Sequence, residues 1–348
     1  MFSACLLLLC RFAAAQAPDS AVRGLERLDF REVIRSATEK VFPAVVFIKC
    51  VRETHEAGKR TSQGVSGSGV IVSPDGEVLT NWHVVDKATE VRCLLLDGQA
   101  LYATVVGTDK DTDLALLRLS RPSDAAALPL APLGDSDALR EGDFVMAMGA
   151  PWGLSRSVSI GIISCTRRFL PDRGEYSLWL QTDAAISPGN SGGPLVNTAG
   201  EVVGVNTLGV TGGGDMGFAI PSAVVRQIAE HIRRCGQVRW SWTGLQLQPL
   251  RDFNRNIYFD ATEGVMIAGT DPDGPAASAG VQPLDRLLKI NGRAVTAMTE
   301  EDLPAIRREL GFLPKDTPAT LELVRGSETL TLALTPREKG KVEGDELD

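Results

Sequence analysis

This chain of 348 residues has few histidines and no cysteines at metal-binding spacing. It has three histidines and six cysteines, and no two cysteines form a Cys-x-x-Cys pair. Because metal sites need such spacing, we expect no metal centre. Positive charge is also in short supply: 36 lysines and arginines stand against 44 aspartates and glutamates, a formal net charge of −8. A chain this acidic is not expected to bind nucleic acid.

The apolar run at the start of the chain is too short to cross a bilayer as a helix. It covers Ala4 to Cys10, and small residues from Ala13 to Ala17 follow it as cleavage sites. We therefore interpret residues 1–17 as a signal peptide, which predicts export to the periplasm or cell envelope and no membrane span after its removal. A disordered tail and an uncleaved anchor are the alternatives, because no Lys or Arg precedes the run.

The cysteines beyond this leader leave the redox state open. Free buried cysteine is common in strand-like runs such as those around Cys50, Cys93 and Cys165. Together with Cys235 they form an even set, which permits a disulfide in an exported protein, but the sequence does not choose a pairing.

A serine lies inside a glycine-rich turn, Gly189-Asn190-Ser191-Gly192-Gly193-Pro194. Glycines let the backbone fold tightly and aim consecutive N–H groups into one small space. A nucleophilic serine needs this arrangement, because its hydroxyl must project while nearby amides receive the charge that grows on an attacked carbonyl.

A base and a carboxylate can be found for that serine. His83 directly follows an apolar strand pattern, whereas His55 lies in a polar loop and His231 in an amphipathic helix, without a chemical neighbourhood. Asp113 opens an apolar strand, so its side chain is drawn toward the interior, where it can orient an imidazole. The order His83, Asp113, Ser191 is that of the chymotrypsin fold rather than of the α/β-hydrolases or subtilisins.

The pattern between about residues 45 and 220 favours antiparallel barrels. Short apolar runs alternate there with Gly, Asp and Pro turns, and long helical periods are missing. Helices are expected at 29–41 and at 221–234, the latter beginning at Pro221. We interpret Thr211 to Asp215 as a mobile wall of the substrate pocket, with a plain hairpin tip as the alternative.

The chain resembles the HtrA/Deg family of trypsin-like serine proteases. The resemblance implies an all-β double barrel over residues 18–235, with Ser191 as nucleophile, His83 as general base and acid, and Asp113 as orienting carboxylate. It implies an oxyanion hole at Gly189, Asn190 and Ser191, and no cofactor. The motifs that carry it are Gly67 to Gly76, Leu79 to Val85, Thr112 to Ala115, Gly142-Asp143, Met148 to Pro151, Gln181 to Ile186 and Gly217 to Pro221.

Two departures from trypsin-like relatives refine this expectation. Asn190 stands where many have Asp and cannot pair with a newly cut N-terminus, so we expect regulation by loops that switch between ordered and disordered forms. Ala185, six residues before Ser191, would form the floor of the specificity pocket, and Ile186 would narrow it. Without a carboxylate there, we predict cleavage after small or medium apolar residues rather than after Lys or Arg.

Residues 240–336 resemble a PDZ domain, a small α+β fold that binds extended peptides at a sheet edge. Its carboxylate-binding loop would be Trp242, Thr243, Gly244 and Leu245, where Thr243 replaces a bulky apolar residue. Docking or gating is the alternative to peptide binding. A helix is expected from Glu300 to Leu310, and residues 337–348 form an acidic tail. The resemblance rests on Gly264 to Ile267, Gly274 to Val281 and Asp285 to Gly292.

These features predict a serine endopeptidase that hydrolyses unfolded or misfolded exported proteins through an acyl-enzyme, in protein quality control and stress response. The PDZ domain would bind substrate or regulate the protease. A peptide-binding chaperone or sensor with minor proteolysis is the alternative, and a PDZ scaffold with a decayed protease is disfavoured by the intact serine turn. The resemblance also implies a homotrimer.

Overall fold

The computed structural model describes residues 29–56, 59–122, 124–151, 156–170, 173–210, 216–251 and 260–338. The predicted signal peptide, the glycine-rich loop at 211–215 and the acidic tail beyond residue 338 lie outside the described residues.

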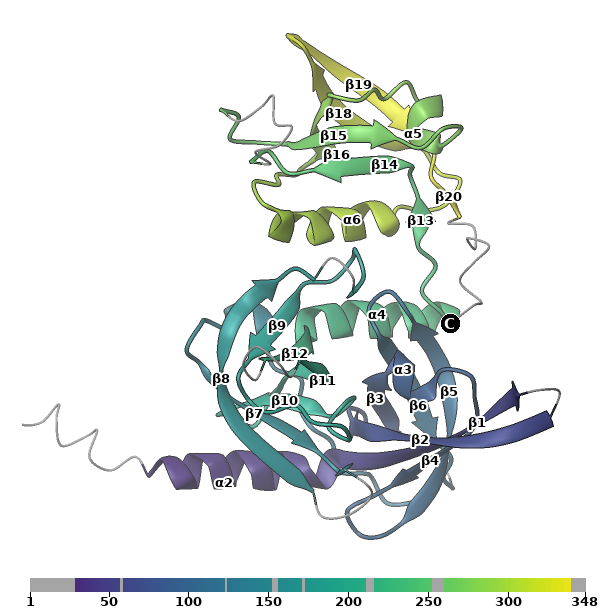
Figure 1. The fold of residues 1–348 in the computed structure, drawn as a ribbon, viewed down its shortest axis with the longest axis vertical. Coiled ribbons are helices and arrows are strands. Elements are labelled where there is room, and N and C mark those ends of the chain that lie inside the picture. Colours follow the sequence, from purple (N-terminus) through teal and green to yellow (C-terminus); the bar gives the residue numbers. More distant parts are fainter. Residues whose placement is uncertain are drawn as a thin grey trace, which may run out of the picture.

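Two closed six-stranded antiparallel barrels form the larger unit, which confirms the double-barrel expectation (Figure 1). The first barrel runs in the order β1-β2-β3-β6-β5-β4 and the second in the order β10-β11-β12-β9-β8-β7. The strands of the first are β1 (Val45–Glu56), β2 (Lys59–Ile71), β3 (Glu77–Asn81), β4 (Ala88–Leu94), β5 (Ala100–Asp109) and β6 (Leu114–Leu119). Those of the second are β7 (Phe144–Gly149), β8 (Ser157–Arg168), β9 (Trp179–Thr182), β10 (Pro194–Asn197), β11 (Val202–Val210) and β12 (Met216–Pro221).

The backbone around His55 differs from the sequence expectation. We expected a polar loop there, but β1 continues to Glu56 and pairs with β2 in one long hairpin, with His55 opposite Arg60. The polar composition was misleading. The apolar part of the hairpin, where Val45 lies opposite Val70, sets the register, and the same pairing continues into the polar end as far as Glu56 opposite Lys59.

Helices frame the barrels at both ends of the domain. α2 (Phe30–Val41) is capped by Asp29, whose side chain accepts from the Arg31 amide, and is followed by the 3-10 turn η1 (Phe42–Ala44). α4 (Ser222–Cys235) ends at Gly236 in the left-handed conformation. Both helices lie close to their predicted ranges, because each has an apolar stripe that packs on the barrels and a polar face outside.

The second unit contains a six-stranded sheet, a separate two-stranded sheet and two helices. Its sheet runs β14-β15-β16-β18-β19, with β17 paired to β16, and β13 pairs separately with β20. The strands are β13 (Ser241–Trp242), β14 (Leu245–Gln248), β15 (Val265–Thr270), β16 (Arg286–Ile290), β17 (Arg293–Ala294), β18 (Ala319–Arg325), β19 (Glu328–Leu334) and β20 (Arg337–Glu338). The helices are α5 (Pro275–Ser278) and α6 (Leu303–Gly311), the latter preceded by the 3-10 turn η5 (Glu300–Asp302).

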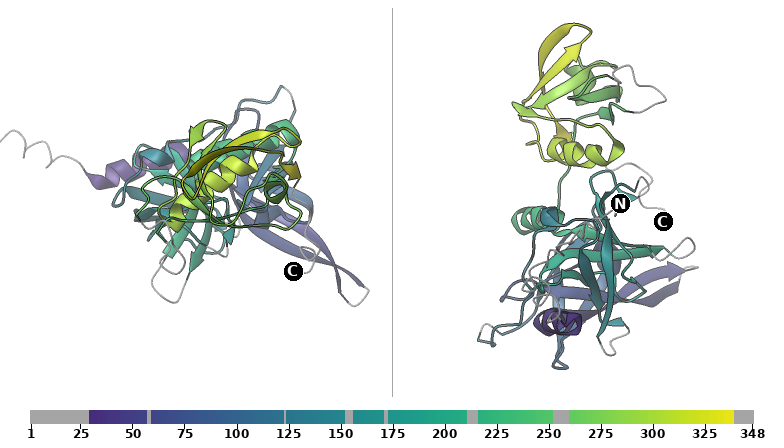
Figure 2. Two further views of the ribbon diagram at one scale, coloured as in Figure 1. Left: turned by 90° about the horizontal axis from the view of Figure 1, so that it is seen from above. Right: turned by 90° about the vertical axis from the view of Figure 1, so that its left-hand side faces the viewer.

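This second unit stacks on the barrels along the long axis of the molecule, with α6 facing α4 (Figures 1 and 2). Its apolar core is separate from the cores of the barrels. Polar contacts cross the junction, since Arg308 donates to the Tyr176 carbonyl at 2.6 Å and Arg167 pairs with Asp302 at 3.0 Å. The two units therefore fold around their own cores and meet through specific side chains.

Candidate active site

His83 and Asp113 are brought together by the first barrel. His83 lies in α3 (Trp82–Val85), a single helical turn directly after β3. Asp113 precedes β6 and adopts a left-handed backbone conformation, with φ 55°. Its carbonyl accepts from the Trp82 amide at 3.0 Å and from Asn81 Nδ2 at 3.1 Å, so the two segments are held side by side.

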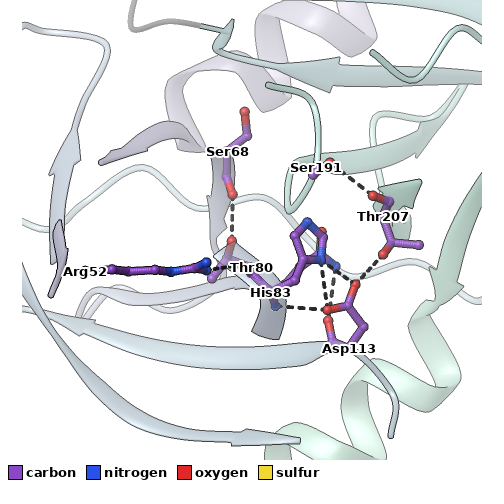
Figure 3. A network of polar contacts seen from close by, with 8 residues as sticks. Arg52, Ser68, Thr80, His83, Asp113, Ser191 and Thr207 are labelled. Atoms are coloured by element: carbon purple, nitrogen blue, oxygen red, sulfur yellow. Dashed lines mark hydrogen bonds and ion pairs between the residues drawn. The ribbon is translucent and has the colours of Figure 1, made fainter. Parts of the chain in front are cut away.

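The side chains of this pair are in direct hydrogen-bond contact (Figure 3). His83 Nδ1 lies 2.8 Å from Asp113 Oδ2 and 2.9 Å from Oδ1, and the His83 amide donates to Oδ1 at 3.0 Å. The Asp113 side chain is 18% exposed and the His83 ring 43% exposed. A carboxylate in this position makes Nδ1 the protonated ring nitrogen and leaves Nε2 free to act as a base.

Thr207 of β11 connects Asp113 to Ser191. Its hydroxyl donates to Asp113 Oδ2, and its backbone carbonyl accepts the Ser191 hydroxyl at 3.0 Å. Sequence reasoning missed Thr207, because a threonine inside an apolar strand carries no motif of its own. In Figure 3 the His83 ring extends from Asp113 toward Ser191, so the three predicted residues converge in one place.

The serine turn is tightly packed, as its glycines require. A Cβ on Gly192, which has φ +82°, would lie 2.2 Å from the Ser68 carbonyl oxygen, and one on Gly193 would lie 2.2 Å from the Met148 carbonyl oxygen. Gly189 has φ +104°, and the next amide, that of Asn190, closes a turn onto the Ser187 carbonyl at 2.9 Å. Only glycine fits these positions without strain or collision.

Two amides in this turn are available to an incoming oxygen. Within the described ranges, neither the Gly189 amide nor the Ser191 amide donates to a protein acceptor. The neighbouring amides are used, because Gly192 donates to the Asn206 carbonyl at 2.8 Å and Gly193 to the Asn190 carbonyl at 2.9 Å. Free N–H groups beside a serine hydroxyl are what a developing oxyanion needs.

Ser68 of β2 ties the serine turn to the first barrel. Its hydroxyl donates to the Gly189 carbonyl at 2.5 Å and accepts from the Ala150 amide at 2.8 Å. Its amide donates to the Ser191 carbonyl at 2.8 Å. The Gly67-Ser68-Gly69 motif was the signal for this residue, although the sequence alone did not reveal its partners.

Arg52 of β1 is a second contact that the sequence did not reveal. Its guanidinium donates to the backbone carbonyl of His83, which restrains the short helix α3 from the side opposite Asp113 (Figure 3).

Asn190 is buried and uncharged, with 6% of its surface exposed. Its Oδ1 accepts from the Ser157 hydroxyl at 3.2 Å, a neutral partner on β8. The side chain thus has a hydrogen bond that needs no charged terminus.

Ala185 and Ile186 lie in the segment that leads to the serine turn. Ala185 is exposed, and its carbonyl accepts from the Ser159 hydroxyl at 2.6 Å. Ile186 is half-buried, and its Cδ1 lies 2.8 Å from the place where a side chain on Gly217 would begin. The isoleucine side chain therefore occupies space that Gly217 leaves open.

The loop from Trp242 to Leu245 lies far from this serine in the chain, at the entry to β14. It lines a groove of about 350 Å³ between β14 and α6. The groove is lined by the second unit together with Glu175 and Tyr176 of the barrel unit, whereas the serine turn lies wholly within the barrel unit. Among the described residues, no group of three or more His, Cys, Asp or Glu could hold a metal ion, and no helix has the length and apolarity needed to cross a membrane.

Comparisons with known proteins agree with this geometry. Residues 67–205 match the trypsin-like peptidase domain family, and residues 237–311 match the PDZ domain family. Among solved structures, an HtrA-type protease, AlgW with a tripeptide, superposes with a TM-score of 0.76 at 32% identity, covering 89% of this chain and 98% of that one. The serine endoprotease from Yersinia pestis gives a TM-score of 0.64 at 31% identity, covering 88% and 98%.

Curated relatives are similar over longer proteins. A probable periplasmic serine endoprotease, DegP-like, from Halomonas elongata is 42% identical over 273 residues, which is 77% of this chain and 56% of that protein. A DegP-like relative from Pseudomonas putida strain W619 is 39% identical over 329 residues, 93% of this chain and 64% of that protein. The chain thus spans little more than half the length of these curated relatives.

Proposed function

The chain belongs to the HtrA-type serine proteases with a PDZ domain, and from this premise we propose that it is a serine endopeptidase. The observation that carries the proposal is the continuous connection from His83 through Asp113 and Thr207 to Ser191. No other group of side chains in the described structure joins a hydroxyl, an imidazole and a half-buried carboxylate in this way.

Catalysis begins with rotation of the Ser191 hydroxyl away from the Thr207 carbonyl toward His83 Nε2. His83 takes the hydroxyl proton as Ser191 Oγ attacks the scissile carbonyl, and Asp113 stabilises the imidazolium that forms. The tetrahedral oxyanion lies at the amides of Gly189 and Ser191. His83 then gives its proton to the leaving amine, and water repeats the cycle on the acyl-enzyme to release the acid.

Cleavage specificity follows from Ala185 and Ile186. An alanine at the floor would offer no negative charge to a Lys or Arg side chain, and the Ile186 side chain, which occupies the space beside Gly217, would narrow the pocket to small or medium apolar residues. The regulation we propose is a rearrangement of the loops around Ser191 on binding of peptide or a partner, since Asn190 supplies no charge for an N-terminal ion pair.

The substrates we propose are unfolded or misfolded proteins of the periplasm. The curated relatives are named periplasmic endoproteases, and the structural relative AlgW was solved with a peptide. The open groove beside β14 supports a role of the PDZ domain in binding an extended polypeptide.

A homotrimer is part of the proposal, and an exposed apolar strip supports it. Phe30 on α2 contacts Phe144 on β7, with ring centroids 4.7 Å apart, and both rings are more than 40% exposed. Val158 and Ile160 on β8 extend this strip, at 38% and 46% exposure. Burial of such a strip against another copy would remove apolar surface from water. Light scattering of Phe144→Ser should show monomers where the native chain shows trimers.

One experiment separates this function from its alternatives. A fluorophosphonate probe should label the native chain and fail to label Ser191→Ala, and unfolded casein should be cut after Val, Ala or Ile. A decayed scaffold would not be labelled at all. If labelling is normal but casein stays intact while Ser191→Ala suppresses aggregation, the chaperone or sensor alternative replaces the protease proposal.

A further inference from the structure

The groove in the PDZ domain has an open strand on one side. β14 is an edge strand of its sheet, so its outer backbone groups can pair with an added strand. Leu245 and Leu247 of β14 and Leu310 of α6 line the groove. This arrangement suits an extended polypeptide with apolar side chains at alternate positions.

At the end of this groove near Trp242, the carboxylate of Asp271 already accepts hydrogen bonds from two side chains of the chain itself. Asp271 accepts from the Trp242 indole N–H at 2.8 Å through Oδ2 and from Gln246 Nε2 at 2.9 Å through Oδ1. Asp271 also approaches the loop closely, since its Cβ lies 3.5 Å from where a Cβ on Gly244 would be. The chain itself therefore places a negative charge where a peptide carboxylate would have to enter.

Thr243 adds a second obstacle in the same loop. Its side chain is buried, and Oγ1 accepts the Leu245 amide at 3.4 Å. A carboxylate bound in a backbone loop is held by consecutive N–H groups. With the Leu245 amide already directed at Thr243, fewer donors are left for a ligand anion.

The charged side chains that line the groove leave it negative. Glu175 reaches it from the protease domain and Asp271 from the PDZ domain, against Arg307, the one cation among the described residues that line it. Arg307 Nε lies 3.9 Å from Glu175 Oε2, so its charge is largely offset by that partner. Asp271 then dominates the field that a ligand meets beside Gly244.

We propose that this groove binds an internal stretch of extended polypeptide with a basic residue beside Asp271, and that it discriminates against a free C-terminal carboxylate. A carboxylate brought next to Asp271 is repelled and finds the Leu245 amide already directed at Thr243, whereas a lysine or arginine side chain gains an ion pair. This inference rests on the proposed peptide-binding role of the PDZ domain and names the ligand class for it.

The test uses the full chain carrying Ser191→Ala, so that peptides stay intact. Two fluorescein-labelled dodecapeptides share one sequence of alternating valine and serine that ends in Val-Lys, and they differ only in a free acid or a carboxamide end. Fluorescence anisotropy should give a dissociation constant about tenfold lower for the carboxamide. Replacing the lysine by glutamate should raise the dissociation constant of the carboxamide peptide by a similar factor.

Two matched variants locate the cause. Asp271→Asn removes the charge but keeps an acceptor. The dissociation constants of the two peptides for this variant should lie within about twofold of each other. Asp273→Asn removes a charge two residues away, at a left-handed position that asparagine tolerates, and should leave the tenfold ratio in place. The peptide pair on the unaltered groove tests the inference even if a variant fails to fold.

Equal or tighter binding of the free acid overturns the inference, as does a preference that survives Asp271→Asn, or binding of neither peptide. None of these results bears on the endopeptidase proposal, which is tested separately by fluorophosphonate labelling of the native chain.

Discussion

The indole N–H of Trp240 donates to Asp109 Oδ1 at 2.9 Å, across the junction between the linker and the first barrel. Asp109 Oδ2 in turn accepts from the Thr112 hydroxyl at 2.6 Å and from its amide at 3.1 Å. Asp113 directly follows Thr112, so the buried Asp109 carboxylate organises the turn that presents the orienting carboxylate of the proposed site.

Trp240 also connects this turn to the PDZ domain. Its ring stacks on Tyr176 at 4.1 Å and 7°, and contacts Phe312 just after α6 at 4.7 Å. Gly311 must be a glycine here, because a Cβ would lie 2.6 Å from the Trp240 ring. One linker side chain thus contacts the turn at Asp109, the protease loop at Tyr176 and Phe312 at the end of α6.

We predict that Trp240→Phe lowers both stability and turnover. The phenyl ring can keep the stacking but leaves Asp109 Oδ1 without its donor, which should cost about 1.5–3 kcal/mol because the acceptor is a buried carboxylate. Peptidase kcat should fall severalfold with little change in KM, since the turn holding Asp113 loosens. Urea unfolding and steady-state peptide cleavage measure the two effects.

Trp179→Phe is the matched control for that variant. Trp179 is buried like Trp240, but its indole N–H has no acceptor within the described structure. Truncation there creates a similar cavity and breaks no hydrogen bond. If Trp240→Phe costs no more than Trp179→Phe, the bond to Asp109 contributes nothing to stability.

A pH-dependent stability is expected from Asp109. Burial, opposed by the bonds from Thr112 and Trp240, raises the pKa of Asp109 from its ordinary 3.8 to about 6. Between these two values the folded chain holds a proton that the unfolded chain has lost, so stability falls as pH rises from about 4 to 6. The full effect is about 3 kcal/mol at most, because each pKa unit corresponds to about 1.4 kcal/mol.

Comparison with Asp109→Asn isolates this contribution, since asparagine does not titrate. As pH rises from about 4 to 6, the unfolding free energy of the native chain should fall relative to that of the variant, whatever the absolute difference between them. A difference that stays constant from pH 4 to 7.5 would show that Asp109 is not perturbed by burial.

Much of this architecture was accessible from sequence because it depends on local backbone demands. The glycines around Ser191 carry conformations and contacts that exclude side chains, and such requirements leave a readable motif. His83 and Asp113 were recognisable because each adjoins an apolar strand that fixes its place in a barrel. The alternation of short strands with turns favoured antiparallel barrels, and the family resemblance implied that there are two of them.

The residues that sequence reasoning missed act through tertiary contacts. Thr207 and Ser68 are ordinary strand residues whose hydroxyls matter only because distant segments meet there. Trp240 reads as a linker residue, and nothing local indicates that Asp109 receives its N–H. Arg52 lies in the hairpin that replaces the polar loop expected around His55, and it contacts the His83 carbonyl from there. Such partners depend on closure of the barrels and cannot be seen in a window of sequence.

The packing of Gly192 predicts a severe effect of the smallest possible side chain. Gly192→Ala adds a Cβ 2.2 Å from the Ser68 carbonyl oxygen and 2.3 Å from Thr80 Oγ1. Fluorophosphonate labelling of Ser191 should therefore be lost. Gly98→Ala is the control, because Gly98 has a similar φ of +86° but nothing within 4 Å, so it should cost only about 1 kcal/mol and leave labelling intact. Normal labelling of Gly192→Ala would mean that the serine turn tolerates displacement.

Thr207 offers a test of how Asp113 is oriented. Thr207→Val keeps the shape and the backbone carbonyl that receives Ser191, but removes the hydroxyl that donates to Asp113. The carboxylate can then rotate away from His83, so we expect kcat to fall about tenfold, equivalent to about 1.4 kcal/mol of transition-state stabilisation, with KM nearly unchanged. Thr207→Ser restores the donor and should recover most of the rate. Full activity of the valine variant would show that His83 alone keeps Asp113 in place, and loss of activity in the serine variant would point to packing of the threonine methyl instead.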